Sequence, residues 1–471
     1  MNRTVAGREP WQCDAATLAG AYATGALSPV EAFASVQARM RQVQPVLNAI
    51  VCWDEDGALA AARASEARWR RGMPWSPLDG VPLTVKDNIP VQGLPCRWGS
   101  RLYEDHVPQH DELAVARLRA GGAVLLGKTN VPEFTLLGYT DNLLAGPTRN
   151  PWDPALTPGG SSGGAVAAVA SGVGPLALAT DGGGSIRRPC SHAGLAGLKP
   201  GRDRVPRENG LPELLPGLEV AGPIARSVDD LLRMLDVIAP APGRTLAQGP
   251  RRVAVWRAIA DGPVDEEILA GLEEAVAVLQ GFGHAVEVRP ASAIVDRFNR
   301  EAWPVVAASG LLRVLQPFVE REGEDAVAQK LTPAMRAMWE AGRVLPVGAA
   351  AKAQELVRDL RAEMATMFES TDVLLTPSAA ALPWPATRTH PGRIADRDAG
   401  PRDHAAFTAF VNACGLPALA LPMGWSRSGL PYGLQLVGPR ASEEQLCALG
   451  RQWEQARPWG HRWPLPEECQ P

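Results

Sequence analysis

Hydrophobic residues recur at roughly helical spacing near the start of the chain, a pattern typical of amphipathic helices. Between Asp14 and Val43 the recurring residues are Leu18, Tyr22, Val30, Phe33, Val36 and Met40. Ser28-Pro29 has the composition of an N-cap followed by the first residue of a helix, so this stretch predicts two helices. Residues 111–120 predict another, which begins at a cap-type aspartate and ends before Gly121-Gly122.

Short apolar runs predict strands between these helices. The runs are 82–85, 123–126, 175–179, 253–256, 285–288, 373–375 and 434–437. Asp265 caps a helical pattern that Gly283 ends, so the strands on either side of it form a predicted βαβ unit. A largely helical stretch follows from about 300 to 370. Because helices and strands alternate throughout, the sequence predicts an α/β layered fold.

The segment 239–252 is rich in proline, glycine and arginine, and it is the best candidate for an internal boundary. A chain of 471 residues exceeds the usual size of a single core, although large α/β enzymes often form one domain. The pattern alone therefore leaves the number of domains open.

Composition and charge indicate which kinds of molecule the protein is expected to bind. Hydrophobic residues make up 46% of the chain and charged residues 21%, which is ordinary for a globular protein. The net charge of −4 is spread along the chain, with no basic stripe, so we expect no nucleic-acid partner. The seven cysteines are scattered and never spaced as C-x-x-C, which indicates free thiols and no metal site.

The first residues, MNRTVAGREPWQCDAATLAG, contain no apolar run of the length of a secretory signal. No stretch approaches the roughly 20 consecutive apolar residues of a membrane span. We therefore expect a cytoplasmic protein that has no contact with a membrane.

Two short motifs match known catalytic or phosphate-binding patterns, but the residues around them do not favour those functions. Residues 122–129 fit the phosphate-binding pattern G-x-x-x-x-G-K-[ST], but a helix precedes them and their apolar middle favours a strand. Residues 160–164 fit G-x-S-x-G with Ser162 as the nucleophile, but three prolines precede them where an apolar strand would be required. None of the seven histidines lies in a recognisable catalytic context, so a Ser-His-Asp triad finds little support.

A stronger candidate site is the stretch Thr180-Asp181-Gly182-Gly183-Gly184-Ser185-Ile186-Arg187. Consecutive glycines leave their amides uncovered, so that successive N–H groups converge into an anion-binding nest beside a hydroxyl. Such a nest next to a nucleophile is an oxyanion hole. The plain alternative is a flexible turn that ends in a serine helix cap. A second glycine-embedded serine cluster upstream and a small-residue helix at 165–170 favour the catalytic reading.

These residues strongly resemble the amidase signature family. The matching run is TRNPWDPALTPGGSSGGAVAAVASGVGPLALATDGGGSIRRP, with PLDGVPLTVKDNI before it and GLAGLKP after it. The likeness continues through LLTPSAAALPWPA and GLPALALPMGWSRSGLPYGLQLVG, and so covers nearly the whole chain. It implies one large α/β/α domain over residues 1–471, built around a central mixed, mostly parallel sheet surrounded by helices.

The resemblance implies a catalytic triad in which Ser185 is the nucleophile, Ser161 the bridging serine after a cis peptide bond, and Lys86 the base. A serine hydroxyl needs a base to accept its proton, and lysine is a base only when it is neutral. The apolar approach to Lys86 favours burial, which lowers the pKa of an amine. Alternation along the strand would point Asp87 to the other side.

The amides of Gly182, Gly183, Gly184 and Ser185 would bind the oxyanion, while Asp181 and Arg187 either brace the loop or form a plain structural ion pair. Ser162 would support the loop. The chain departs from the commoner family pattern at Gly182, where many members have threonine, and at Arg188-Pro189-Cys190-Ser191-His192. His192 either lines the pocket or has a structural role, and we expect the acyl pocket to come from helices at 300–345 and loops near Trp384.

The implied function is hydrolysis of a linear carboxamide through an acyl-enzyme, without a cofactor or metal and with a small-molecule amide as substrate. Three alternatives stay open. One is a hydrolase of a small urea derivative, of the carboxybiuret or allophanate type, that works with a small companion subunit. Another is the amidase subunit of a tRNA-dependent amidotransferase, although only four tyrosines are present and 300–370 carries no Tyr- and Arg-rich segment. The third is an inactive binding protein. For assembly, the resemblance leaves open a homodimer or a complex with a small companion subunit.

Overall fold

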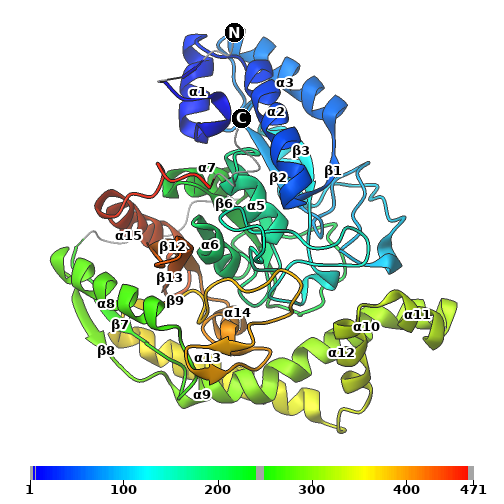
Figure 1. Ribbon diagram of the computed structural model, residues 1–471, viewed down its shortest axis with the longest axis vertical. Coiled ribbons are helices and arrows are strands. Elements are labelled where there is room, and N and C mark those ends of the chain that lie inside the picture. The colour runs from blue at the N-terminus through cyan, green and yellow to red at the C-terminus, as the bar shows by residue number, and fades with distance from the viewer. Residues whose placement is uncertain (1–3, 6, 240–248, 465–471) are drawn as a thin grey trace.

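The computed structural model describes residues 4–5, 7–239 and 249–464, whose strands form one large mixed sheet (Figure 1). The order of the 11 strands in it is β1-β3-β2-β4-β6-β5-β12-β13-β9-β7-β8. In chain order they are β1 (Ile50–Trp53), β2 (Pro82–Lys86), β3 (Val124–Thr129), β4 (Leu176–Asp181), β5 (Ala196–Lys199), β6 (Val220–Ala225), β7 (Arg252–Val255), β8 (Ala285–Val288), β9 (Val373–Pro377), β12 (Ala418–Trp425) and β13 (Pro431–Val437). A separate small pair consists of β10 (Arg393–Ile394) and β11 (Arg397–Asp398).

Parallel pairing is confined to two blocks of the sheet. One block joins β3, β2 and β4, and the other joins β9, β7 and β8. Between the blocks, from β4 to β9, each strand pairs antiparallel with its neighbour, and β1 pairs antiparallel at the edge. The layered α/β fold with a mixed central sheet is therefore confirmed, as is the predicted βαβ unit of β7 and β8.

Helices cover the sheet (Figure 1). They are α1 (Ala15–Thr24), α2 (Pro29–Leu47), α3 (Glu55–Arg70), α4 (Leu113–Ala120), α5 (Gly163–Ala170), α6 (Arg187–Ala193), α7 (Val228–Ile238), α8 (Glu266–Gly281), α9 (Ala293–Arg297), α10 (Trp303–Glu322), α11 (Glu324–Lys330), α12 (Pro333–Arg343), α13 (Ala349–Ser370), α14 (Ala409–Ala413) and α15 (Glu443–Ala456). Every residue of α5 is buried, as expected for a tightly packed helix of small side chains.

Cap residues in the sequence predicted the start of two helices correctly and the start of a third incorrectly. Ser28 caps α2, with Pro29 as its first residue, and Asp265 caps α8. The predicted cap at Asp111 is wrong, because α4 begins later, with Glu112 at the N-cap position. The Asp111 carboxylate is used elsewhere: it accepts a hydrogen bond from the Gln92 amide at 2.7 Å and pairs with Arg119 at 2.8 Å.

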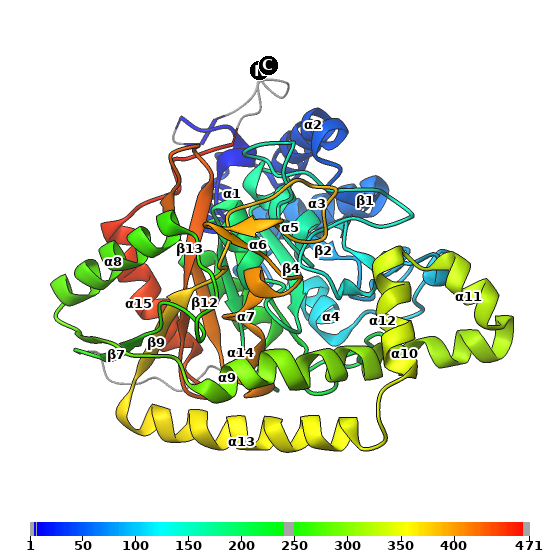
Figure 2. The same ribbon diagram turned by 60° about the horizontal axis from the view of Figure 1, so that its bottom comes forward.

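The predicted helical stretch after residue 300 forms α10 to α13. Figure 2 shows α13 running alongside α10 at one side of the molecule, and the two helices are in contact. Within helical residues 293–322, one window of 18 residues has the length and composition of a membrane-spanning helix, with a mean hydropathy of 1.3. Core helices of globular proteins often share these properties, and α10 buries one face, which includes Leu311, Val314 and Leu315.

The candidate boundary at 239–252 falls largely on residues 240–248, which lie outside the described residues. Strands from both sides of this segment belong to the same sheet, where β9 joins β13 to the block of β7 and β8. The six described cysteines are free thiols, as predicted; Cys469 lies outside the described residues.

Candidate active site

Lys86 is the last residue of β2, a strand whose five residues are all buried. Because β2 pairs with β4 in parallel, its end lies beside the end of β4 and the loop that follows. Lys86 Nζ lies 2.8 Å from Ser161 Oγ and donates a hydrogen bond to the Thr180 carbonyl at 3.0 Å. The structure therefore brings together two residues that are 75 positions apart in the sequence.

Burial lowers the pKa of Lys86 from 10.5 to about 7, although the charges of Asp181 and Glu219 oppose the shift. Among the described residues, no carboxylate lies within ion-pair distance of Lys86. The neighbouring Asp87 points to the other side of the strand, as alternation predicts, and its carboxylate lies 3.5 Å from Lys128. A substantial fraction of Lys86 is therefore neutral near pH 7.

The GGSSGG stretch forms the turn that leads into α5. The Gly160–Ser161 peptide bond is cis, as the family resemblance implied. A side chain at Gly160 would lie 2.5 Å from the Tyr139 carbonyl oxygen, so only glycine fits there. Ser162 has a different environment: its amide donates to the Ser185 carbonyl at 3.2 Å and its hydroxyl to the Thr180 carbonyl at 3.4 Å. These contacts join the loop of Ser161 to the loop of Ser185.

The glycine loop follows β4 and ends at Ser185, and α6 begins two residues later. The Gly184 amide donates to Asp181 Oδ1 at 2.7 Å, so the carboxylate already uses one of the four predicted oxyanion donors. Among the described residues, the amides of Gly182, Gly183 and Ser185 have no hydrogen-bond partner. These three N–H groups are the ones left for an anion.

Asp181 and Arg187 form a buried ion pair that also organises the loop. Arg187 donates to both carboxylate oxygens, at 2.9 and 3.0 Å, while the Ile186 amide donates to Oδ2 at 3.0 Å. Burial favours the neutral acid, but Arg187 holds the pKa of Asp181 well below its usual range. The sequence left two alternatives, a structural ion pair or a brace for the loop. The pair has both features, because Asp181 binds Arg187 and also accepts hydrogen bonds from the Gly184 and Ile186 amides.

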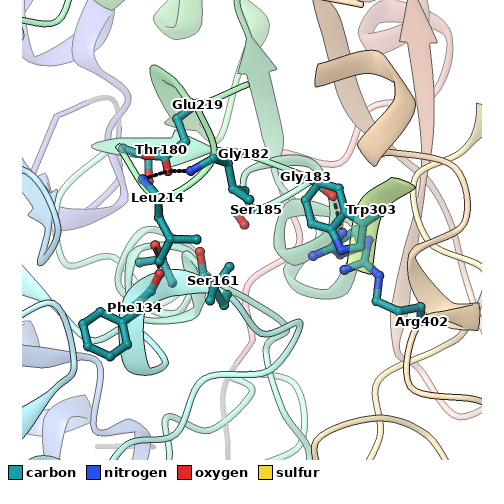
Figure 3. Close-up of a pocket in the computed structure, with 14 residues that line it drawn as sticks. Phe134, Ser161, Thr180, Gly182, Gly183, Ser185, Leu214, Glu219, Trp303 and Arg402 are labelled. Atoms are coloured by element: carbon teal, nitrogen blue, oxygen red, sulfur yellow. Dashed lines mark hydrogen bonds between the residues drawn. The ribbon is translucent and has the colours of Figure 1, made fainter. Parts of the chain in front are cut away.

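A cavity of about 400 Å³, including its open mouth, lies in front of these loops (Figure 3). Its lining residues are Phe134, Thr135, Leu136, Ser161, Thr180, Gly182, Gly183, Ser185, Arg188, Leu214, Leu215, Glu219, Trp303 and Arg402. Ser161 and Ser185 both face this cavity, but no hydrogen bond joins their hydroxyls among the described contacts. Lys86 lies behind Ser161, fully buried.

Sequence reasoning anticipated Ser161, Ser185 and the glycine loop at this cavity and the approach of Lys86 to Ser161, but few of the other lining residues. Trp303 lies within the helices predicted to build the pocket, whereas Trp384 is not part of the lining. His192 is also absent from it: its Nε2 lies 3.1 Å from the Ala381 carbonyl, and burial lowers its pKa to about 4. The sequence identifies Arg188 only as an unusual polar residue near the site. It gives no signal for Arg402, because the loop before this residue has no periodic pattern.

The two arginines in the wall differ in their surroundings. Arg188 donates to the Gly183 carbonyl and to Thr408 Oγ1 at 3.0 Å, and burial together with Arg402 lowers its pKa to about 9. Arg402 lies over the Trp303 ring, 4.5 Å from its centre, and burial lowers its pKa to about 10. Within the described part of the chain, neither arginine pairs with a carboxylate, so this wall carries uncompensated positive charge.

Comparison with known proteins shows what this architecture is similar to. Residues 31–447 match the amidase family. The chain is 37% identical to a putative amidase, AmiB2, of Mycobacterium tuberculosis, over 96% of this chain and 97% of the relative. It is 35% identical to one subunit of the glutamyl-tRNA(Gln) amidotransferase of Synechococcus, over 89% and 91%. A bacterial aryl acylamidase has a similar structure, with a TM-score of 0.87 at 28% identity over 95% and 97% of the two chains.

Proposed function

This chain belongs to the amidase family and is an amide-hydrolysing enzyme, and on that premise we propose that it cleaves a linear carboxamide by acyl transfer to Ser185. Ser161 relays protons and Lys86 is the base. The observation that carries the proposal is the 2.8 Å contact between Lys86 and Ser161 at the base of the cavity that Ser185 also lines.

In the first half of the reaction, the Ser185 oxygen forms a bond to the carbonyl carbon of the substrate. Its proton passes to Ser161, whose own proton passes to Lys86, because a hydroxyl both donates and accepts. As the C–N bond breaks, Ser161 protonates the leaving nitrogen and recovers a proton from Lys86. In the second half, water attacks the ester along the same relay, which releases the acid and frees Ser185.

The unpartnered amides of Gly182, Gly183 and Ser185 supply the donors for the tetrahedral oxyanion. Loss of one such donor in a protease reduces the rate by about 10²–10³. The Gly184 amide takes a different role in this proposal, since Asp181 holds it and thereby keeps the loop in shape. Asp181, Arg187 and Ser162 position the loop without touching the substrate.

An activated-serine probe tests the nucleophile directly. We expect a fluorophosphonate to label the protein at Ser185, as mapped by peptide mass spectrometry. Ser162 is a matched internal control, because it neighbours the same loops but its hydroxyl is directed at the Thr180 carbonyl. Labelling at Ser162, or at no serine, would contradict the assignment.

Substitution tests the base. We expect Lys86→Ala and Ser185→Ala each to lower kcat for a simple amide by about 10⁴-fold or more, because triad members act as a unit. Both variants should remain folded by circular dichroism. Lys352→Ala is the control, since it removes an exposed lysine of α13 that does not line the cavity. Near-normal activity of the Lys86 variant would exclude it as the base.

A second candidate function is that of an amidotransferase component, favoured by the 35% identity to the Synechococcus glutamyl-tRNA(Gln) amidotransferase chain. Such a component would release ammonia from glutamine for a partner. Glutamine hydrolysis that needs a copurified partner would favour this reading. Turnover of simple amides by the isolated chain would favour the amidase, and turnover of ureido acids with a small copurified protein would favour the urea-derivative hydrolase.

The remaining expectations stay proposals. They are a single domain over residues 1–471, a cytoplasmic location, independence of cofactors, and assembly as a homodimer or with a small companion subunit. Size-exclusion chromatography with light scattering of the purified chain measures the assembly directly.

A further inference from the structure

The wall of the cavity that faces Gly183 is built from two arginines and a tryptophan. A side chain at Gly183 would collide with the Trp303 ring, so ring and loop are in close contact. Arg402 lies over that ring, and Figure 3 shows its guanidinium beside Trp303 and Gly183. Arg188 reaches the same place from α6 and donates to the Gly183 carbonyl.

The positive charge of this wall has no internal partner in the described part of the chain. Arg188 makes its contacts to the neutral acceptors of Gly183, Thr408 and Gly160, and its buried Nε has no partner. Among the described residues, the Arg402 side chain has no hydrogen-bond partner and no ion-pair partner. Such partly buried cations are normally compensated by an anion, because removing them from water is unfavourable.

The acidic residues nearby are occupied or too far away. Glu219 also lines the cavity, but its carboxylate accepts the Leu214 and Leu215 amides, at 3.0 and 2.9 Å, and pairs with Arg207 at 3.4 Å. Arg402 borders a second, outer cavity with Asp261, Asp296 and Asp403, none of which lies within ion-pair distance of it. The arginine wall is therefore open to a negative charge from outside the chain.

We propose that this cavity takes amides whose acyl part ends in a carboxylate, which binds between Arg188 and Arg402. The inference rests on the proposed function, because Ser161 protonates the leaving nitrogen and so marks the leaving-group side of Ser185. In Figure 3, Arg402 and Ser161 lie on different sides of Ser185. The substrates are thus monoamides of short dicarboxylic acids, and guanidinium groups suit a carboxylate because their planar forks bind it at two points.

A matched substrate series tests this inference on the unaltered enzyme. Monoamides of succinic, glutaric and adipic acid are compared with their methyl esters by the release of ammonia. We expect kcat/KM to be about tenfold or more higher for at least one carboxylate than for its ester, as for a charge-assisted hydrogen bond. Equal or faster turnover of the esters would overturn the inference and leave the proposed function intact.

Variants of Arg402 test whether this residue is responsible for the preference for a carboxylate over its ester. We expect Arg402→Gln to reduce the ratio of carboxylate to ester kcat/KM by about tenfold or more, and Arg402→Lys to retain part of it. Arg300→Gln is the control, because Arg300 borders only the outer cavity and pairs with Asp296. An unchanged ratio in Arg402→Gln would overturn the placement. If neither substrate class is hydrolysed and no probe labels Ser185, the proposed function fails and this inference fails with it.

Discussion

Lys86 shows how one buried amine acquires a chemical role from its surroundings. Its side chain is fully enclosed, and its contacts are a hydroxyl and a carbonyl, neither of which stabilises an ammonium as an ion pair does. Lys128, on the neighbouring strand, is equally buried but lies beside Asp87. The same residue type thus has opposite environments on two adjacent strands.

The pKa of Lys86 predicts the acid side of the pH profile. Because the base must be neutral and its pKa is about 7, kcat/KM for an uncharged amide should rise as the pH increases through about 7 and then level off. Below that pH the amine is protonated and the relay is blocked. The measurement is kcat/KM between about pH 5 and pH 9. A profile that stays flat over this range would contradict the assignment of the base.

Arg187 predicts a large effect on stability. Arg187→Met leaves the Asp181 carboxylate buried without its partner, and loss of one member of a buried pair reduces the free energy of unfolding by about 3–5 kcal/mol. Arg300→Met, which removes an exposed partner of Asp296, serves as the control and should unfold like the wild type. Urea unfolding measures both, and equal stabilities would contradict the bracing role of Arg187.

At the scale of elements, the cavity depends on how closely α10 approaches the loop before β6. Gly310 lies in α10 at the point where a side chain would collide with the Leu214 carbonyl oxygen. Leu214 and Leu215 in turn line the cavity, and Trp303 comes from the first turn of the same helix. One glycine therefore sets the distance between two walls of the pocket.

Substitution of this glycine has a predictable outcome. Gly310→Ala should push α10 away from the Leu214 loop, reduce the free energy of unfolding by about 1–3 kcal/mol, and raise KM. Gly20→Ala is the matched control, because Gly20 lies in the exposed middle of α1 with open space around it. That control should stabilise the protein by about 0.5–1 kcal/mol. A stabilising Gly310→Ala would show that the helix accommodates the added methyl group.

At the scale of the whole molecule, one sheet connects the two halves of the chain. Strand β12 pairs with β5 from the first half and with β13 from the second, and β13 pairs with β9. The largest cluster of buried residues extends from Ala15 to Trp459 and includes residues on both sides of the segment 239–252, such as Ala239 and Val253. We expect such a structure to behave as one cooperative unit.

Equilibrium unfolding tests this expectation. Tryptophan fluorescence and far-ultraviolet circular dichroism should give coincident transitions in urea, because buried tryptophans such as Trp98 and Trp453 lie in the same continuous core. Two separated transitions would instead indicate two domains with their boundary near 239–252.

Sequence reasoning anticipated the placement of Lys86, Ser161 and Ser185 more fully than the walls of the cavity, for a physical reason. Lys86, Ser161 and Ser185 stand in local contexts that show in the chain itself: the end of an apolar strand, a glycine-embedded turn, and a glycine nest before a helix. The confinement of parallel pairing to two blocks depends on which distant strands meet. The position of Arg402 and Glu219 in the cavity wall cannot be predicted from the sequence either, since loops without periodicity bring them there through contacts between remote segments.

The walls of the cavity come from different parts of the chain, which affects how substitutions change substrate preference. Groups proposed to break the bond come from residues 86–187, whereas Trp303 and Arg402 come from the second half of the chain. We expect substitutions at position 402 to alter which molecules fit without contact to Lys86, Ser161 or Ser185, whereas Trp303 also packs against Gly183. Because these walls are separate in sequence from the proposed triad, we expect a library restricted to positions 303 and 402 to yield variants that remain active and differ in substrate preference.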